Sequence, residues 1–174
     1  MTSTIPIGAG GSSCVVEELG EPRHASLQQL KAYWLAKKGA AFAPPRSAIR
    51  PEEIVALLPN IALVDVVGDP PRFRVRLFGT ALAAAYGGDI TGKFVDEVDF
   101  DAIGGDVIAH MTTVVRECRP CAVRISLTKE ADGRHIDYER IWLPLSQDGV
   151  RVNMLLGGVA VERAYASVTP PPHP

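Results

Sequence analysis

The stretch Arg72-Phe73-Arg74-Val75-Arg76-Leu77-Phe78-Gly79-Thr80 alternates arginine with apolar residues and ends at a glycine. Alternation with a period of two is typical of a β-strand that has one polar face and one buried face. Phe73, Val75 and Leu77 are therefore expected to face a core, and the three arginines to face the opposite side. The apolar run 61–67 and the turn residues 68–71 precede this strand, so we expect the two strands to form an antiparallel hairpin.

The segments on either side of this hairpin predict an α+β domain. A helix is expected from Ser26 to Lys38, with a capping box formed by Ser26 and Gln29 and with Gly39 at its end. A short helix over 51–58, stopped by Pro59, comes before the hairpin, and helices over 80–86 and about 102–118 come after it. Strands at 122–128, 135–146 and 150–161 follow, with Asp132-Gly133 and Asp148-Gly149 as hairpin turns between them. The expected fold is a five-stranded antiparallel sheet with helices on one face and an additional N-terminal helix.

Length, charge and composition exclude several classes of protein. The 174 residues suit one domain, which we place at 23–165, between a flexible tail at 1–22 and a proline-rich tail at 166–174. The net charge is −2 and no basic run stands out, which argues against a nucleic-acid surface. No apolar run approaches the ~20 residues that span a bilayer. The N-terminus lacks the pattern of a signal peptide and the number of cysteines is odd, so we expect a cytoplasmic protein with neither a nucleic-acid nor a membrane partner.

A series of short motifs in a fixed order links this chain to a known family. The series comprises Tyr33-Trp34, Pro45-Arg46 with Ile49 and Pro51, Leu58-Pro59-Asn60-Ile61, the arginine strand with Gly79-Thr80, Gly88-Asp89-Ile90-Thr91-Gly92, Glu139-Arg140, Leu143-Pro144-Leu145-Ser146 and Asp148-Gly149. From about Leu27 to Glu162 the sequence resembles short bacterial PAS-like domain proteins that are common in alphaproteobacteria. The order of two strands, a helical segment and three strands is also that of a PAS domain. The resemblance implies a sensor or interaction domain that surrounds a small cavity and is often dimeric, but it implies no particular ligand.

We therefore expect a non-enzymatic sensory or signalling domain that binds a small ligand or a protein partner and forms a homodimer. No cofactor is expected. The cavity is expected between the sheet and the helices of residues 80–118. The candidate lining residues are Tyr86, His110, Met111, Val114 and Trp142. The candidate residues for contact with a partner are Leu27, Leu30, Trp34, Arg72, Arg74, Arg76 and Arg140.

Two other functions stay open at this stage. The first is a small enzyme of the cone-shaped α+β type, in which Asp65 or Asp89 would be the acid and His110 the base. The second is a dimerisation or scaffold module without a ligand. The strand arginines have two interpretations as well: they form solvated pairs with the carboxylates of Asp65, Asp137 and Glu139, or they recognise an acidic partner.

Three local patterns have a cofactor or metal interpretation beside a structural one. His110 lies at the edge of an apolar helical stripe, and its position resembles that of the haem-ligating histidine in haem-binding PAS domains. Cys118-Arg119-Pro120-Cys121 is a single C-x-x-C pair, which only His110 and His135 could extend into a metal site. The segment 87–94 approximates a phosphate-binding loop but has Phe94 where a hydroxyl is required. For all three patterns we favour the structural interpretation, with no cofactor and no metal.

Overall fold

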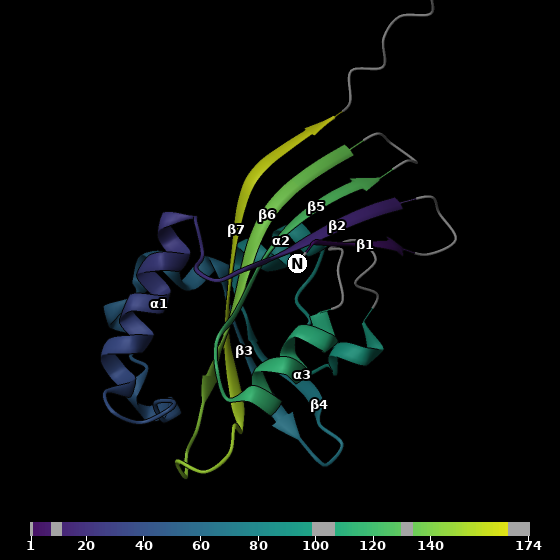
Figure 1. Ribbon diagram of the computed structural model, residues 1–174. Helices are drawn as coiled ribbons and strands as arrows, with labels where there is room; N and C mark the ends of the chain where they lie inside the picture. The colour runs from purple at the N-terminus through teal and green to yellow at the C-terminus, as the bar shows by residue number, and fades with distance from the viewer. Residues whose placement is uncertain (1, 8–11, 99–106, 130–133, 167–174) are drawn as a thin grey trace, which may run out of the picture.

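The computed structural model describes residues 2–7, 12–98, 107–129 and 134–166, and these residues build a seven-stranded antiparallel sheet (Figure 1). The strand order is β1-β2-β5-β6-β7-β3-β4. The strands are β1 (Thr2–Ile7), β2 (Ser12–Leu19), β3 (Ile61–Val67), β4 (Arg72–Phe78), β5 (Cys121–Lys129), β6 (Arg134–Leu145) and β7 (Met154–Ala166). The α-helices are α1 (Ala25–Lys38), α2 (Thr80–Tyr86) and α3 (Val107–Glu117), and the 3-10 helices are η1 (Arg46–Ala48), η2 (Pro51–Glu53), η3 (Val55–Asn60) and η4 (Val95–Glu97).

The structure confirms the α+β class and the antiparallel sheet but adds two strands at the N-terminus. β1 pairs with β2, and β2 pairs with β5 from Ser13 opposite Thr128 to Leu19 opposite Ala122. Cys14 and Val16 alternate along β2 and are buried against the apolar side chains of β5. The prediction of a flexible tail is therefore wrong for residues 2–7 and 12–19. The alternating run is short and follows a Gly- and Ser-rich segment, so its strand signal was weak.

Helices cover both faces of the sheet, with α1 on one side and α3 on the other (Figure 1). The prediction of helices on one face holds for α2 and α3, while α1 and the neighbouring 3-10 helices cover the opposite face. The reason lies in β6, where consecutive residues are all buried: Ile141 and Leu143 pack in the core beneath α1, and Trp142 packs in the core beneath α3. A strand that is apolar on both faces requires a covering layer on each.

A buried carboxylate on the sheet fixes the start of α1. Glu139 of β6 is fully buried, and its Oε2 accepts hydrogen bonds from the backbone N–H groups of Arg23 (2.8 Å) and His24 (2.9 Å). His24 is the N-cap residue, and its Nδ1 accepts a hydrogen bond from the Ser26 N–H at 3.3 Å. The predicted capping box at Ser26 is therefore wrong, because a contact with the sheet starts the helix earlier in the chain.

The hairpin of β3 and β4 forms as predicted, but a bulge changes the second half of its alternation. Leu63 pairs with Leu77 and Val64 pairs with Val75, so Arg76 is an extra residue on β4. Phe73 and Val75 are buried, as expected. Leu77 lies beyond the bulge and is 40% exposed, so the prediction that it faces the core is wrong.

The remaining elements differ from their expected bounds. The segment 51–58 forms two 3-10 helices, η2 and η3, rather than one α-helix, and Pro59 lies inside η3 instead of stopping it. The helix expected over about 102–118 is seen as α3, and residues 102–106 lie outside the described residues. The expected turn at Asp132-Gly133 also lies outside the described residues.

The expected turn at Asp148-Gly149 is present, and its hydrogen bonds lower the pKa of the Asp148 side chain. Asp148 Oδ1 accepts hydrogen bonds from the N–H groups of Arg151 (3.0 Å) and Val150 (2.9 Å), and these bonds lower the pKa of Asp148 from 3.8 to about 2. Because the folded-state pKa is depressed, the carboxylate stabilises the turn above its ordinary pKa, and this contribution is lost as the pH falls through about 2. We expect the side-chain carboxyl ¹³C resonance of Asp148 to titrate with a midpoint of about 2. A midpoint at the ordinary value would contradict this turn.

Candidate ligand-binding cavity

A cavity of about 140 Å³ lies between the sheet and the helices α2 and α3, where the sequence predicted one. Its wall is almost entirely apolar. The sheet contributes residues from β3, β4, β5, β6 and β7, while α2 contributes Ala81, Leu82 and Ala85, and α3 contributes Val107 and Met111. Asn60, Phe78, Ile90 and Val95 also line it.

The spacing of residues along β6 and α3 explains why several lining side chains face the same region. Along β6, Tyr138, Arg140 and Trp142 occupy alternate positions, so all three lie on the face of the sheet that carries α3. Along α3, Val107 and Met111 lie one turn apart and are buried against the same region. The wall therefore consists of one face of the sheet and one stripe of α3, closed at one side by α2.

The three β6 side chains bring polar groups to this apolar wall. Arg140 is buried, and its Nη2 lies 2.8 Å from His110 Nδ1, which accepts a hydrogen bond from it. Burial raises the pKa of Tyr138 to about 12, so its phenol stays neutral. Trp142 is 5% exposed, and its indole Nε1 is buried without a hydrogen-bond acceptor among the described residues.

The predicted cavity residues all lie in or beside this region, at different depths. Met111 and Trp142 line the cavity. Tyr86 packs edge-on against Phe78 of the wall, with 6.3 Å between ring centroids, and Val114 is buried in the same core cluster without lining the cavity. His110 is half-buried, is not among the lining residues, and accepts a hydrogen bond from Arg140 of the wall.

The candidate lining residues included none on β3, β4, β5 or β7, and on α2 they included only Tyr86. Val64, Val159 and Ala81 line the cavity, yet none was a candidate. Their alternation or helical spacing shows which residues share a face. It does not show which face meets the cavity, because both faces of this sheet are apolar.

The apolar residues predicted to contact a partner are instead buried in the core of the same chain. Leu27, Leu30 and Trp34 are at most 2% exposed and pack on the sheet beneath α1. Trp34 also donates its indole N–H to the Pro144 carbonyl at 2.8 Å. Arg140 lies in the cavity wall. These four residues are therefore not on a free surface of the chain in this conformation.

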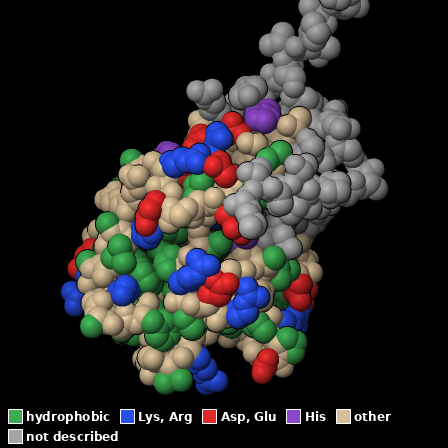
Figure 2. Space-filling model, viewed as in Figure 1, with side chains coloured by type: hydrophobic (Ala, Val, Ile, Leu, Met, Phe, Trp, Pro, Cys, Tyr) green, Lys and Arg blue, Asp and Glu red, His purple; other side chains and the backbone are tan. Residues whose placement is uncertain are grey.

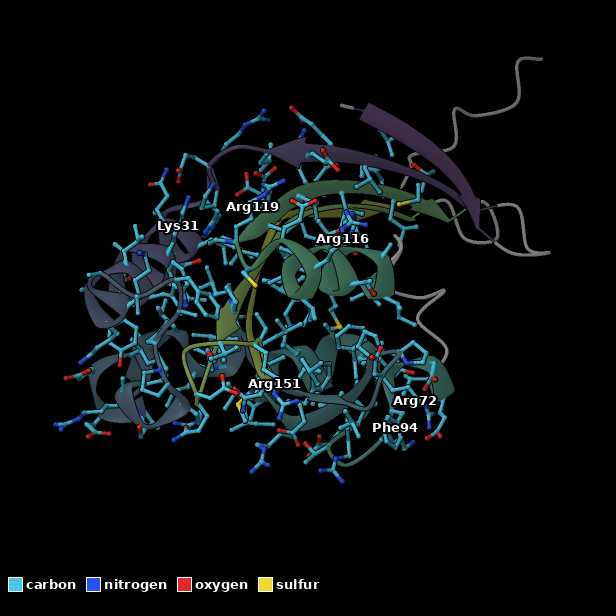
Figure 3. The ribbon with its side chains drawn as sticks, turned by 60° about the horizontal axis from the view of Figure 1, so that its bottom comes forward. Lys31, Arg72, Phe94, Arg116, Arg119 and Arg151 are labelled. Carbon is cyan, nitrogen blue, oxygen red and sulfur yellow. The ribbon has the colours of Figure 1, made fainter. Side chains whose placement is uncertain are left out.

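The three arginines of β4 are about half exposed and pair with carboxylates of the same chain. Asp65 binds Arg74 at 3.2 Å and Arg76 at 2.8 Å, which confirms the expected cross-strand pairs with Asp65. Arg72 binds Asp96 at 2.9 Å and lies over the ring of Phe94 (Figure 3). Exposed pairs of this kind contribute little to stability.

The other two expected carboxylates have different partners. Asp137 accepts a hydrogen bond from Ser126 at 2.6 Å and lies near Arg124 and His135, while Glu139 holds the start of α1. Figure 2 shows acidic and basic side chains interspersed over the viewed face rather than gathered into one patch of a single sign.

The cofactor and metal patterns find no support in the geometry. Burial raises the pKa of the Cys121 thiol, which opposes the thiolate form needed for redox or metal chemistry. No three His, Cys, Asp or Glu side chains are grouped for a metal ion in the parts of the chain that the structure describes. The segment 87–94 runs beside β4, where the Gly92 N–H and the Lys93 carbonyl both bond to Val75, so its backbone is engaged in pairing. His110 is not among the residues that line the cavity, so the expected position of a haem ligand does not coincide with it.

Both carboxylates of the enzyme alternative bind other groups of the chain. Asp65 is held by two arginines on β4, and Asp89 is exposed and accepts hydrogen bonds from Thr91. Neither carboxylate lines the cavity. Within the residues described, no helix has the length and apolar character needed to cross a membrane.

A family model for the PAS domain matches residues 22–160, which is most of the chain. The chain belongs to the PAS domain family. The match begins just before α1, so β1 and β2 lie outside the part of this PAS domain that the family model covers. Membership supports a sensory or signalling role, which is the general role of PAS domains.

Among solved structures, this PAS domain is similar to that of an RNA-binding Light-Oxygen-Voltage receptor. The TM-score is 0.49 and the sequence identity is 15%, over 88% of this chain and 40% of the receptor chain. This PAS domain thus spans well under half of the receptor, and the likeness concerns the fold alone. No curated protein matches the chain.

Proposed function

We propose that this PAS domain is a non-enzymatic sensor that binds a small, largely apolar molecule in the cavity between the sheet and the helices α2 and α3. The observation that carries the proposal is the cavity itself, whose described wall is mostly apolar and includes three side chains with polar groups along β6. Ligand sites typically combine an apolar wall with a few such polar groups.

The volume of the cavity limits the size of its occupant. At about 140 Å³ it is close to the ~150 Å³ of an engineered apolar cavity, in another protein, that stays dry and binds benzene. A single small ring or a short branched chain would fill it. Haem and flavin are far larger, so we propose a dissociable ligand rather than a resident cofactor.

We further propose that the signal passes by protein contact and that the domain is a homodimer, as the family resemblance implies. Native mass spectrometry of the freshly purified full chain tests both parts of the proposal. We expect the mass of a dimer, with a small co-purified molecule on part of the population. A strictly monomeric mass over micromolar concentrations would contradict the homodimer.

Filling the cavity with a side chain from α2 is expected to abolish ligand binding. Ala81 lines the cavity, whereas Ala84 of the same helix is exposed and lies outside the lining. Leucine and alanine have similar helix propensities, so Ala81→Leu and Ala84→Leu differ mainly in where the added atoms lie. We expect Ala81→Leu to weaken the binding of cyclohexanone, measured by calorimetry, at least tenfold, and Ala84→Leu to leave it unchanged. Equal affinities for the two variants would argue that the ligand binds elsewhere.

A further inference from the structure

We infer that the ligand of this cavity carries a hydrogen-bond acceptor, a neutral carbonyl or ether oxygen, which binds the indole N–H of Trp142. The inference rests on the proposed function and specifies the chemical class of the ligand. Its basis is a buried donor that has no acceptor among the residues that the structure describes.

Trp142 belongs to the wall and is almost fully buried, with 5% of its surface exposed. Its Nε1 has no acceptor among the described residues. The second tryptophan of the chain, Trp34, donates its N–H to Pro144 at 2.8 Å, which is the usual state of a buried indole. Leaving a buried donor unpaired costs about 1–3 kcal/mol, so an acceptor that entered beside Trp142 would recover part of this cost.

A glycine on the neighbouring strand sets the orientation of the Trp142 ring. Gly157 of β7 lies opposite Trp142, and a Cβ at position 157 would lie 2.3 Å from Cζ3 of the ring. The outer atoms of the six-membered half of the indole therefore lie directly against the backbone of β7 at Gly157. The pyrrole edge, which carries the N–H, is the opposite edge of the ring and points away from this contact.

The rest of the wall favours an acceptor over a donor on the ligand. Among the described residues that line the cavity, none is acidic, and the side-chain acceptors are the amide of Asn60 and the neutral phenol of Tyr138, while Arg140 brings a guanidinium that only donates. A ligand that brought its own N–H or O–H would find few acceptors here. A ligand with one acceptor on an apolar skeleton would match both the indole and the apolar wall.

Cyclohexanone and methylenecyclohexane form a matched pair of probes for this inference. They have the same ring and nearly the same shape, and they differ only in that the ketone oxygen replaces a CH₂ group. Their affinities for the full chain and for Trp142→Phe can be measured by calorimetry or by NMR titration. Phenylalanine keeps an aromatic ring in the wall and removes only the donor and part of the volume.

We expect Trp142→Phe to weaken cyclohexanone binding about tenfold more than it changes methylenecyclohexane binding, since one hydrogen bond is worth about that factor. In the unmodified chain, cyclohexanone should shift the indole N–H resonance that disappears in Trp142→Phe, and should leave the resonance of Trp34 in place. This second measurement follows binding in the unmodified chain, and the variant is needed only to assign the resonance.

The outcomes separate the inference from the proposed function. If both probes shift the methyl resonances of Met111 and Val64 but the Trp142 indole resonance stays fixed, or if both affinities change by the same factor in Trp142→Phe, the cavity binds ligands and the acceptor inference is wrong. If neither probe shifts these methyl resonances, the binding proposal fails and the inference fails with it.

Discussion

Replacing Gly79 by alanine is expected to lower the free energy of unfolding by about 3 kcal/mol, the upper part of the range for overpacked sites. A Cβ at this position would lie 2.3 Å from the carbonyl oxygen of Pro59 and 2.6 Å from that of Leu58. Both are backbone atoms of η3, and the Gly79 N–H is itself bonded to the Ile61 carbonyl at 2.9 Å. Neither side of the contact can move without breaking the junction at which β4 ends and α2 begins.

Gly88 provides the matched control for this substitution. It is exposed, and a Cβ there would meet no atom within 4 Å. We expect Gly88→Ala to change the free energy of unfolding, measured by urea denaturation, by less than about 0.5 kcal/mol, the usual range for surface sites. Equal losses for Gly79→Ala and Gly88→Ala would show that close approach to η3 is not what requires glycine at position 79.

Truncating Trp34 to alanine is expected to lower the free energy of unfolding by about 4 kcal/mol, within the range for large aromatic side chains in cores. The side chain is 1% exposed and packs between α1 and the sheet. Its removal leaves a large void, and it also leaves the buried Pro144 carbonyl without the indole N–H. Trp34→Phe would keep most of the packing and lose the hydrogen bond, so its cost should be intermediate.

The neighbouring residue Leu35 is 45% exposed, and Leu35→Ala serves as the control on the same helix. Thermal and urea unfolding of the three variants should rank them with Trp34→Ala lowest and Leu35→Ala near the unmodified chain. A small effect of Trp34→Ala would mean that α1 is only loosely docked. In that case the earlier prediction that this face of α1 contacts a partner would regain its basis.

Elements whose structure depends on neighbouring residues were predicted correctly from the sequence. The β3–β4 hairpin, α2 and the Asp148-Gly149 turn were predicted from the alternation and turn residues of the segments themselves. The order of motifs predicted the PAS family, which the family model confirms over residues 22–160. The narrower assignment to short bacterial PAS-like proteins stays a prediction.

The errors arose where a distant segment decides the local structure. α1 begins at Ala25 rather than at the expected cap because Glu139, more than a hundred residues away, binds the backbone before it. Leu77 leaves the core because pairing with Leu63 places an extra residue on β4. β2 forms because it pairs with β5 and packs its apolar side chains against those of β5.

The sequence by itself determined the class of fold, the arginine strand with its Asp65 pairs, and the general place of a cavity between the sheet and the later helices. Periodicity and turn chemistry are properties of neighbouring residues, so they can be read from the chain alone. Only the tertiary structure decided which face of each strand meets the cavity, and which polar groups are buried with a partner. Two tryptophans look alike in the sequence, yet Trp34 donates to Pro144 and Trp142 has no acceptor among the described residues. That difference depends on groups brought together from distant parts of the chain, because hydrogen bonding in a core is settled by what packs beside each atom.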